Sequence, residues 1–372
     1  MTLYIGLMSG TSLDGVDGVL VELDDAGTAP PGFRAHVHRD MPEGLRAELL
    51  ALNASGSDEL HRAALAANAL MHLYAEAVDA LLGLGQCAAD EVRAVGAHGQ
   101  TVRHRPGSFD GTGYTLQLAN GALLAERCGI DVVCDFRSRD VAAGGQGAPL
   151  APGFHKALFG GGGRAVLLLN VGGIANLTVL DPGGGVVGFD CGPGNALMDA
   201  WCQRHRGQPY DVGGAWAASG RVDEGLLATL LREPFLATPP PKSTGRDLFN
   251  GPWLDARLAA HAAVSAADVM ATLTEFTARA AADAALGHSG AAAELLVCGG
   301  GAHNMHLMQR LASLLPAVRV SSTADRGVPP DQVEALAFAW LAQAHVLRRP
   351  GNLPSVTGAA GPRVLGALYP AR

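Results

Sequence analysis

Apolar residues along the chain gather in short runs that are separated by clusters of small and polar residues. Residues 3–7 and 16–23 form two such runs, and the turn between them is rich in Gly, Ser, Thr and Asp. Runs of this length around a tight turn predict a β-hairpin. The stretch "AVLLLNVGGIANLTVL" repeats the pattern near the middle of the chain. We therefore divide the chain into an N-terminal lobe, 1–150, and a C-terminal lobe, 151–372, each beginning with a strand hairpin.

Helical spacing of apolar residues predicts most of the remaining elements of an α/β fold. Leucines recur at helical intervals over 43–84, and Asn120 is placed to cap a further helix. Charged residues interrupt the Ala-rich stretch 259–285, which predicts an amphipathic helix. Another helix is predicted to begin near Asp331, and it is a candidate to return to the first lobe.

The composition narrows the classes of function. Of the 372 residues, 48% are hydrophobic and 17% are charged, and the formal net charge is −8. These values are typical of a globular protein, and the chain shows no basic stripe for nucleic acid or an anionic membrane. No stretch is long and apolar enough to span a bilayer. The six cysteines form no CxxC pair and the start lacks the basic segment of a signal peptide, so we expect a cytoplasmic protein with reduced thiols.

Four glycine-rich turns follow apolar runs, and each exposes main-chain N–H groups. Such groups bind anions, above all where a helix begins directly after the turn. One turn alone is also explained as a simple hairpin connection, but four in one chain favour nucleotide phosphates. The chain has no GxxxxGK[ST] motif, so it is not a P-loop protein. The turns are Gly10-Thr11-Ser12, Gly172-Gly173, Gly192-Pro193-Gly194 and Gly299-Gly300-Gly301.

Asp190 lies at the end of an apolar run, directly before one of these turns. A carboxylate in this position suits a general base, which must be ionised to accept a proton. The alternative is structural, because the same carboxylate is placed to cap the helix that begins near Gly194. The neighbouring Cys191 carries a thiol, which donates hydrogen bonds weakly.

Two arginines in "DFRSRD" also have two interpretations. Arg137 and Arg139 pair with Asp135 and Asp140, or they face an anionic substrate. The residues alone leave both open.

The strand and turn sequences resemble those of a known superfamily. "GLMSGTSLDGVDGVLVEL", "NVGGIANLTVL" and "LLVCGGGAHN" look like the first phosphate hairpin, the second phosphate hairpin and the adenosine motif of the sugar kinase, Hsp70 and actin superfamily. A closer resemblance covers residues 6–342. "AHGQTVRH", "DFRSRDVAAGGQGAPLAP", "FDCGPGNALMD", "KSTGRDLFN" and "PDQVEALAFAWLA" are similar to motifs of the anhydro-N-acetylmuramic acid kinases of bacterial cell-wall recycling.

This resemblance implies an α/β fold of two RNase H-like lobes with ATP in the cleft between them. It implies Mg²⁺ and a small anhydrosugar substrate, 1,6-anhydro-N-acetylmuramic acid. The expected reaction hydrolyses the anhydro ring and phosphorylates O6, giving N-acetylmuramate 6-phosphate and ADP. Asp190 would activate the attacking water, and a homodimer is expected.

The resemblance also assigns the remaining site residues. Those expected at the nucleotide are Gly10, Thr11, Ser12, Leu13, Asp14, Gly15, Val16, Asp17, Gly172, Gly173, Asn176, Gly299, Gly300, Gly301 and Asn304. Those expected at the sugar are His98, Gln100, Thr101, Arg137, Gly192, Gly194, Asn195 and Glu334. The run 242–246 lines the cleft in the family, although it also reads as a solvated loop.

The magnesium ligands are the least defined part of this expectation. Asp14 and Asp17 are placed to help hold Mg²⁺, usually through water, or to stabilise the turn instead. The wider superfamily commonly carries an acidic residue just before this turn, whereas this chain reads "YIGLMSG" there.

Two other functions stay open on sequence grounds. One is a related kinase of levoglucosan-type anhydrosugars. The other is a non-catalytic nucleotide or sugar sensor on the same fold, against which stand the retained Asp190 and the lack of a basic helix-turn-helix stretch.

Overall fold

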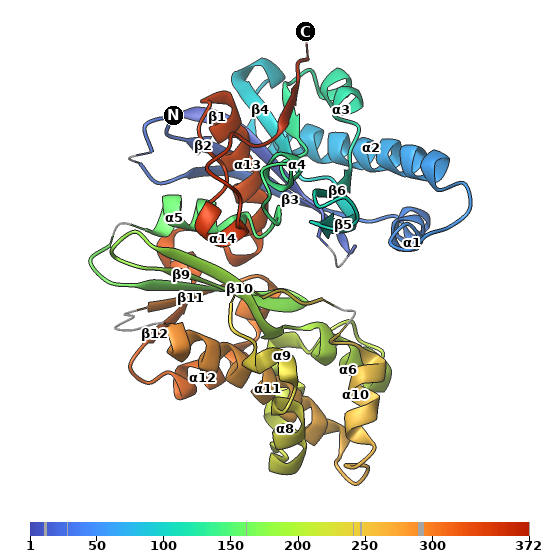
Figure 1. Cartoon of the computed structure of the whole chain (residues 1–372), viewed down its shortest axis with the longest axis vertical. Helices are drawn as coiled ribbons and strands as arrows, with labels where there is room; N and C mark the ends of the chain where they lie inside the picture. Colours follow the sequence, from blue (N-terminus) through green and yellow to red (C-terminus); the bar gives the residue numbers. More distant parts are fainter. Residues whose placement is uncertain are drawn as a thin grey trace. The chain divides into compact units, whose positions relative to one another are not determined.

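The chain folds into two compact units. The computed structural model describes residues 1–10, 13–27, 29–160, 162–240, 242–245, 248–288 and 294–371. Unit 1 consists of Met1–Leu158 together with Gln332–Arg372, and unit 2 of Phe159–Asp331 (Figure 1). The boundary between the units lies at Leu158 rather than at 150, and the helix expected to begin near Asp331, a candidate to return to the first lobe, belongs to unit 1.

Unit 1 is built on a six-stranded sheet with the strand order β13-β7-β4-β1-β2-β3. The neighbours β1, β4 and β7 run parallel, whereas the pairs β1–β2, β2–β3 and β7–β13 are antiparallel. A separate hairpin is formed by β5 and β6. The strands are β1 (Thr2–Met8), β2 (Gly15–Leu23), β3 (Gly32–Asp40), β4 (Val92–Ala97), β5 (Gln100–Pro106), β6 (Gly113–Leu118), β7 (Val132–Cys134) and β13 (Ala367–Tyr369). The helices are α1 (Glu43–Ala51), α2 (Glu59–Gly85), α3 (Gly121–Cys128), α4 (Ser138–Val141), α5 (Ala151–Phe159), α13 (Val333–Val346) and α14 (Pro354–Thr357).

Unit 2 is built on a five-stranded sheet with the order β10-β9-β8-β11-β12. As in unit 1, the first strand is central, forms an antiparallel hairpin with the second, and is parallel to the fourth. The strands are β8 (Val166–Val171), β9 (Ile174–Leu180), β10 (Val186–Pro193), β11 (Glu294–Cys298) and β12 (Arg319–Ser322). The helices are α6 (Ala196–Arg206), α7 (Ala215–Ser219), α8 (Glu224–Leu231), α9 (Pro234–Ala237), α10 (Gly251–Leu258), α11 (Ala266–His288) and α12 (Met305–Leu314). The repeated topology confirms the predicted fold of two RNase H-like α/β lobes.

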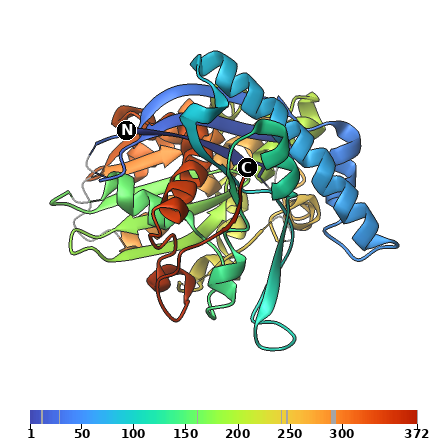
Figure 2. The same cartoon turned by 90° about the horizontal axis from the view of Figure 1, so that it is seen from above.

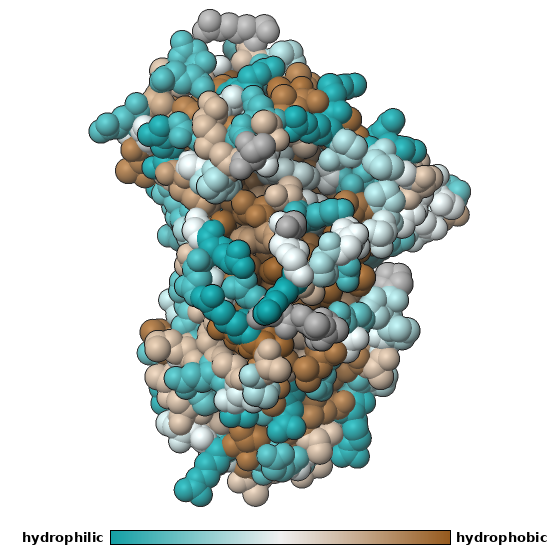
Figure 3. All heavy atoms as spheres, turned by 90° about the vertical axis from the view of Figure 1, so that its left-hand side faces the viewer, coloured by the Kyte–Doolittle hydropathy of each residue, from teal (hydrophilic) through white to brown (hydrophobic). Residues whose placement is uncertain are grey.

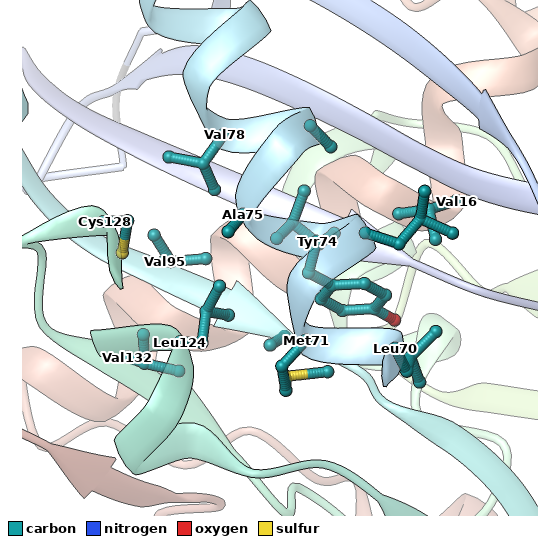
Figure 4. Packing of buried hydrophobic residues seen from close by; sticks show 14 of the residues in the cluster. Val16, Leu70, Met71, Tyr74, Ala75, Val78, Val95, Leu124, Cys128 and Val132 are labelled. Carbon is teal, nitrogen blue, oxygen red and sulfur yellow. The ribbon is translucent and has the colours of Figure 1, made fainter. Parts of the chain in front are cut away.

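The long helix α2 supplies one side of the core of unit 1. It crosses the strands of the sheet (Figure 2). Its buried residues Leu70, Met71 and Tyr74 pack with Val16 of β2 and Val95 of β4 (Figure 4). Removing these side chains from water drives α2 onto the sheet and fixes its position.

Helix α13 packs on the opposite face of the same sheet. Gly6 of β1 and Gly96 of β4 lie in register on neighbouring parallel strands. A Cβ on Gly6 would lie 1.9 Å from the Ala335 carbonyl oxygen, and one on Gly96 would lie 2.0 Å from that of Phe338. The main chain of α13 can approach so closely because neither strand position carries a side chain. This contact places Glu334, in the first turn of α13, beside the ends of the central strands.

Several local predictions need correction. The helical region 43–84 is two helices, α1 and α2, separated by a turn in which Asp58 has φ +50°. The segments that follow β4 and β7 form further elements, strand β5 from Gln100 and helix α4 from Ser138. The Asn120 cap is confirmed, because its side chain accepts a hydrogen bond from the Leu123 N–H at 3.1 Å.

The Ala-rich stretch is helical only from Ala266 onwards, and it is buried on more than one side. Glu275, expected on a solvent face, is 2% exposed and accepts hydrogen bonds from Arg279 and Arg310 at 2.8 and 2.7 Å. These arginines hold the pKa of Glu275 below its usual value against the opposing effect of burial, which is the largest influence.

The surface carries a mixture of polar and apolar residues, as the composition of a globular protein predicts. On the face shown in Figure 3, hydrophilic residues are spread widely and hydrophobic residues form smaller groups between them. Within the described ranges, the helices all fall short of the combined length and apolarity that crossing a bilayer requires.

The close approach of α13 gives a stability prediction. We expect Gly96→Ala to lower the free energy of unfolding by about 3 kcal/mol, because the new methyl group forces the helix main chain away from the sheet. Gly44→Ala is the matched control, since a Cβ at this position in α1 meets nothing within 4 Å; it should change stability by less than about 1 kcal/mol. Urea unfolding of both variants measures this, and equal midpoints would contradict the packing argument.

Candidate active site

The first glycine turn joins β1 to β2 in unit 1 and is held from two sides. The Gly10 carbonyl oxygen accepts hydrogen bonds from the Leu13 N–H and from Gln100 Nε2, both at 3.2 Å. The Asp14 carbonyl oxygen accepts one from the Met41 N–H at 2.8 Å. Thr11 and Ser12, both expected at the nucleotide, lie outside the described residues. Gln100 was expected at the sugar; its amide nitrogen bonds to the first turn, and its side-chain oxygen is buried without a hydrogen-bond partner among the described residues.

A buried hydroxyl network lies directly beneath this turn. Ser9 and Tyr74 are both 0% exposed, and their oxygens are 3.0 Å apart. The Ser9 hydroxyl also donates to the Gly99 carbonyl oxygen at 3.0 Å. Because the single Ser9 proton is used there, the Tyr74 hydroxyl must donate to Ser9. Burial raises the pKa of Tyr74, so the phenol keeps this proton.

His98 connects the turn to Arg137. Its Nδ1 is 3.2 Å from the Ser9 carbonyl oxygen, and its Nε2 is 3.0 Å from Arg137 Nη2. A guanidinium can only donate, so Nε2 accepts and Nδ1 carries the proton. Burial, and then the charge of Arg137, lower the pKa of His98 to about 3. The imidazole is therefore neutral, and both of its nitrogens have partners within unit 1.

Arg137 is held by main chain and by His98 rather than by a carboxylate. Its Nη1 donates to the Gly147 carbonyl oxygen at 2.9 Å. Asp135 accepts instead from the Ser138 hydroxyl at 2.5 Å. Burial lowers the pKa of Arg137 to about 10, against the opposing charges of Glu334 and Asp140. The hydrogen bonds of Arg137 therefore do not go to Asp135 or Asp140, as the pairing interpretation of "DFRSRD" expected.

Asp140 is a structural carboxylate. It is fully buried and accepts hydrogen bonds from the Gly147 N–H at 2.8 Å, Asn352 Nδ2 at 2.6 Å and the Thr357 hydroxyl at 2.8 Å. These three donors satisfy the hydrogen-bonding groups of a side chain that water does not reach. Asp140 therefore fastens the loop that carries Arg137 to the C-terminal segment of unit 1.

Glu334 lies among the charges at this edge of the sheet. The residue as a whole is solvent-exposed, but protein atoms lie close around its carboxyl group and desolvate it. Desolvation, followed by the carboxylates of Asp17 and Asp14, raises the pKa of Glu334, and Arg137 opposes them. A carboxyl with a raised pKa beside an arginine suits contact with a polar ligand.

Two further polar residues of β5, Thr101 and Arg103, have different kinds of partner. Thr101 accepts a hydrogen bond from Gln117 Nε2 at 3.2 Å. Arg103, which follows it in the same motif, pairs with Glu59 of α2. That ion pair accounts for Arg103 structurally.

Asp14 and Asp17 do not form a complete metal site. Asp17 Oδ1 is 2.9 Å from His38 Nδ1 and 3.6 Å from His36 Nε2. Interactions with these two histidines hold the pKa of Asp17 below its ordinary value despite burial, the largest influence. Asp14 is exposed, and its Oδ1 accepts from the Gly15 N–H at 3.1 Å. Across the described part of the chain, His, Cys, Asp and Glu side chains form no group of three that fits a metal ion.

In unit 2 the second glycine turn is bonded to the turn before α6. The Gly172 carbonyl oxygen accepts from the Asn195 N–H at 2.8 Å, and that of Gly173 accepts from the Gly194 N–H at 3.0 Å. Asn195 Nδ2 donates to the Val171 carbonyl oxygen at 3.0 Å. A Cβ on Gly194 would lie 2.1 Å from the Gly172 oxygen, so this contact requires glycine. Gly194 and Asn195, both expected at the sugar, hold the two turns together.

The fourth turn, Gly299-Gly300-Gly301, lies between β11 and α12. The Gly299 N–H donates to the Pro330 carbonyl oxygen at 3.0 Å, and Gly300 begins a short 3₁₀ turn, Gly300–His303. The Asn304 side chain accepts from the Leu307 N–H at 3.0 Å and caps α12. Asn304 was expected at the nucleotide; in the structure its side-chain oxygen accepts the capping hydrogen bond of α12.

Asp190 stands at the carboxyl-terminal part of β10, where it pairs in register with Asn176. Its Oδ2 accepts from the Thr244 N–H at 2.9 Å, and its own N–H donates to the Lys242 carbonyl oxygen at 3.2 Å. The N-cap position of α6 is Asn195. The helix-capping interpretation of Asp190 therefore has no support in these contacts.

Burial raises the pKa of Asp190 to about 6, while the Thr244 N–H and then the charge of Lys242 lower it. The sequence predicted an ionised carboxylate, and a pKa near 6 leaves it mostly ionised at neutral pH. A base with a pKa close to the operating pH is well suited to accepting a proton.

Cys191 lies at an irregularity of the strand pairing between Asp190 and Gly192. Its thiol is 2% exposed and donates to the Ala175 carbonyl oxygen at 3.3 Å. Burial, and then Asp190, raise the pKa of this thiol to about 12. Cys191 is therefore a protonated core residue. A β-bulge of this kind re-aims neighbouring side chains.

Comparison with known proteins agrees with this geometry. A sequence model of the family described as "Anhydro-N-acetylmuramic acid kinase" matches residues 2–371. The chain belongs to this family. Proteins named anhydro-N-acetylmuramic acid kinase are 59% identical to it in Variovorax paradoxus, over 99% of both chains, and 60% identical in Bordetella petrii, over 99% of this chain and 96% of the relative. A relative of the same name in Pseudomonas paraeruginosa is 54% identical over the full length of both.

Membership in the kinase family makes the chain a phosphotransferase and confirms the resemblance read from its motifs. The structure adds contacts that the motifs did not indicate. The partnership of Ser9 with Tyr74 joins a residue near the first turn to one in an apolar helix, and the sequence around Tyr74 carries no signal of it. Lys242 and Thr244 belong to the run 242–246, which the resemblance placed along the cleft. Their contact with Asp190 joins residues far apart in the chain. Arg246 lies outside the described residues.

The hydroxyl network beneath the kinase's first turn gives a second stability prediction. Ser9→Ala should lower the free energy of unfolding by about 2 to 3 kcal/mol, because it leaves the Tyr74 hydroxyl and the Gly99 carbonyl buried without this partner. Tyr74→Phe should cost only about 1 kcal/mol, since Ser9 keeps its bond to Gly99. Urea unfolding of the two single variants and the double variant tests the order, and an equal or larger loss for Tyr74→Phe would refute the assigned proton direction.

Proposed function

We propose that this kinase uses ATP and water to convert 1,6-anhydro-N-acetylmuramic acid to N-acetylmuramate 6-phosphate and ADP, with Asp190 as the general base. Family membership supports the substrate and product. The observation that carries the role of Asp190 is its half-buried carboxyl, which has a pKa of about 6 and is held by Thr244 at the end of a strand beside glycine turns. The product feeds the recycling of cell-wall amino sugars.

In this mechanism ring opening and phosphoryl transfer are coupled. Asp190 takes a proton from water, whose oxygen attacks the anomeric carbon. The bond from that carbon to O6 breaks, and O6 attacks the γ-phosphorus of ATP. The bond from the γ-phosphorus to the bridging oxygen then breaks and ADP leaves. Phosphoryl transfer of this kind depends on positioning and charge stabilisation more than on covalent help.

The nucleotide contacts are proposed to be the glycine turns, whose main-chain N–H groups donate to phosphate oxygens. Mg²⁺ would neutralise charge on the phosphates. Because the described residues offer no three-ligand cluster, the donor set fits an ion held mainly by phosphates and water, with the exposed carboxylate of Asp14 as a candidate contact. Asp17 is already bonded to His38 and is the weaker candidate.

The sugar contacts are proposed to centre on Arg137, Glu334 and Thr101 of unit 1, with Gly192 of unit 2. Arg137 suits the lactyl carboxylate, because a guanidinium binds a carboxylate through two parallel hydrogen bonds. The homodimer and the cytoplasmic location expected from the sequence remain part of this proposal. A levoglucosan-type kinase and a non-catalytic sensor are not favoured, since the relatives at 54% to 60% identity carry the name of the muramic acid enzyme.

A coupled ADP-release assay with 1,6-anhydro-N-acetylmuramic acid tests this function. The wild-type chain should turn over, and Asp190→Asn should lose at least about 1000-fold in kcat, because the amide cannot take the proton from water. Levoglucosan, run in parallel, should be a much poorer substrate. Turnover retained in Asp190→Asn would remove the base from the mechanism, and a preference for levoglucosan would overturn the substrate.

The pH dependence should follow the Asp190 carboxyl. With a pKa of about 6, its deprotonated form is lost as the pH falls, so kcat/KM should drop about tenfold per pH unit below this value. Lys242→Met removes a charge that lowers this pKa, so the acid limb should move to higher pH. Lys156→Met, a change of the same type at an exposed residue of α5, is the control. A limb that stays in place in Lys242→Met would contradict the assignment.

A further inference from the structure

The ends of three neighbouring parallel strands in unit 1 meet at His98. Strand β1 ends before Ser9, β4 ends before His98, and the connection after β7 carries Arg137. The His98 N–H continues the strand pairing by donating to the Leu7 carbonyl oxygen at 3.0 Å. The carboxyl ends of parallel strands share one edge of a sheet, where ligands of α/β proteins commonly bind. His98 therefore stands between the phosphate turn and the arginine.

The imidazole has little freedom to move. It is 5% exposed, and its ring centroid lies 4.7 Å from that of Phe338 on α13. Phe338 in turn packs against Phe136, with the ring centroids 5.6 Å apart. With the ring fixed, the hydrogen bonds at Nδ1 and Nε2 have fixed directions too. A shift of Arg137 therefore acts on the Ser9 carbonyl through one rigid group.

We propose that His98 is a positioning residue that couples the sugar arginine, Arg137, to the main chain of the nucleotide turn, so that sugar and ATP bind cooperatively. This inference rests on the proposed function, which places a sugar carboxylate at Arg137 and phosphates at the turn. It reassigns His98, which the sequence placed among the sugar contacts. The ring acts through its two partners and touches neither substrate.

The two hydrogen bonds can be broken one at a time. In His98→Asn the amide nitrogen occupies the place of Nδ1 and still donates to the Ser9 carbonyl, but no acceptor reaches Arg137. In His98→Gln the amide oxygen occupies the place of Nε2 and still accepts from Arg137, but no donor reaches Ser9. The matched control is His345→Asn, because His345 on α13 also bonds a main-chain carbonyl, that of Leu365, at 2.7 Å.

Steady-state kinetics should separate the two variants. We expect His98→Asn to raise KM for 1,6-anhydro-N-acetylmuramic acid about tenfold and KM for ATP less than twofold. His98→Gln should show the reverse, and His345→Asn should match the wild type. A residue that only supports the fold would raise both constants together in both variants, and that result would overturn the inference.

Calorimetric binding gives the coupling directly. For the wild type, saturating 1,6-anhydro-N-acetylmuramic acid should tighten binding of the β,γ-imido analogue of ATP at least fivefold. Both His98 variants should reduce this factor below twofold, and coupling that stays at the wild-type value would overturn the inference. Wild-type coupling without turnover would refute the proposed function alone. Turnover without coupling in the wild type would refute the role of His98 alone, and no sugar binding would refute both.

Discussion

The arrangement of unit 1 depends on the close packing of main chain at the centre of its sheet. Gly6 and Gly96 lie side by side on β1 and β4, and the main chain of α13 rests on them. A helix at this distance brings its first turn to the edge where the parallel strands end. Glu334 and Phe338 thereby reach Arg137 and His98. A segment from the end of the chain thus completes a site that the first strand begins.

Polar groups around that site are satisfied by partners from distant segments. Ser9 bonds to Tyr74 and Gly99, and Asp140 bonds to Asn352 and Thr357. Buried hydrogen-bonding groups are costly to leave unpaired, so each network fixes the positions of the loops that it joins.

In unit 2, the half-buried carboxyl of Asp190 has fewer hydrogen-bond donors than the polar groups of these networks. Burial disfavours the ionised carboxylate, and a single main-chain N–H with a nearby lysine restores only part of what water supplied. Asp140 of unit 1, by contrast, accepts hydrogen bonds from three donors. Asp190 is left under-stabilised, which is the condition that a base needs. Local destabilisation of this kind is typical of functional sites.

The sequence by itself determined the two-lobe α/β plan, the strand hairpins, the glycine turns and Asp190, because each is encoded in short contiguous patterns of apolar, small and acidic residues. It also identified the family, since eight motifs occur in order. Only the tertiary structure decided what the polar side chains do. His98, Gln100, Asn195 and Asn304 were all predicted to contact a ligand, and the structure shows that each also forms a hydrogen bond within the protein. A side chain's partner depends on segments that are brought together by long-range packing, and that information is absent from its neighbours in the chain.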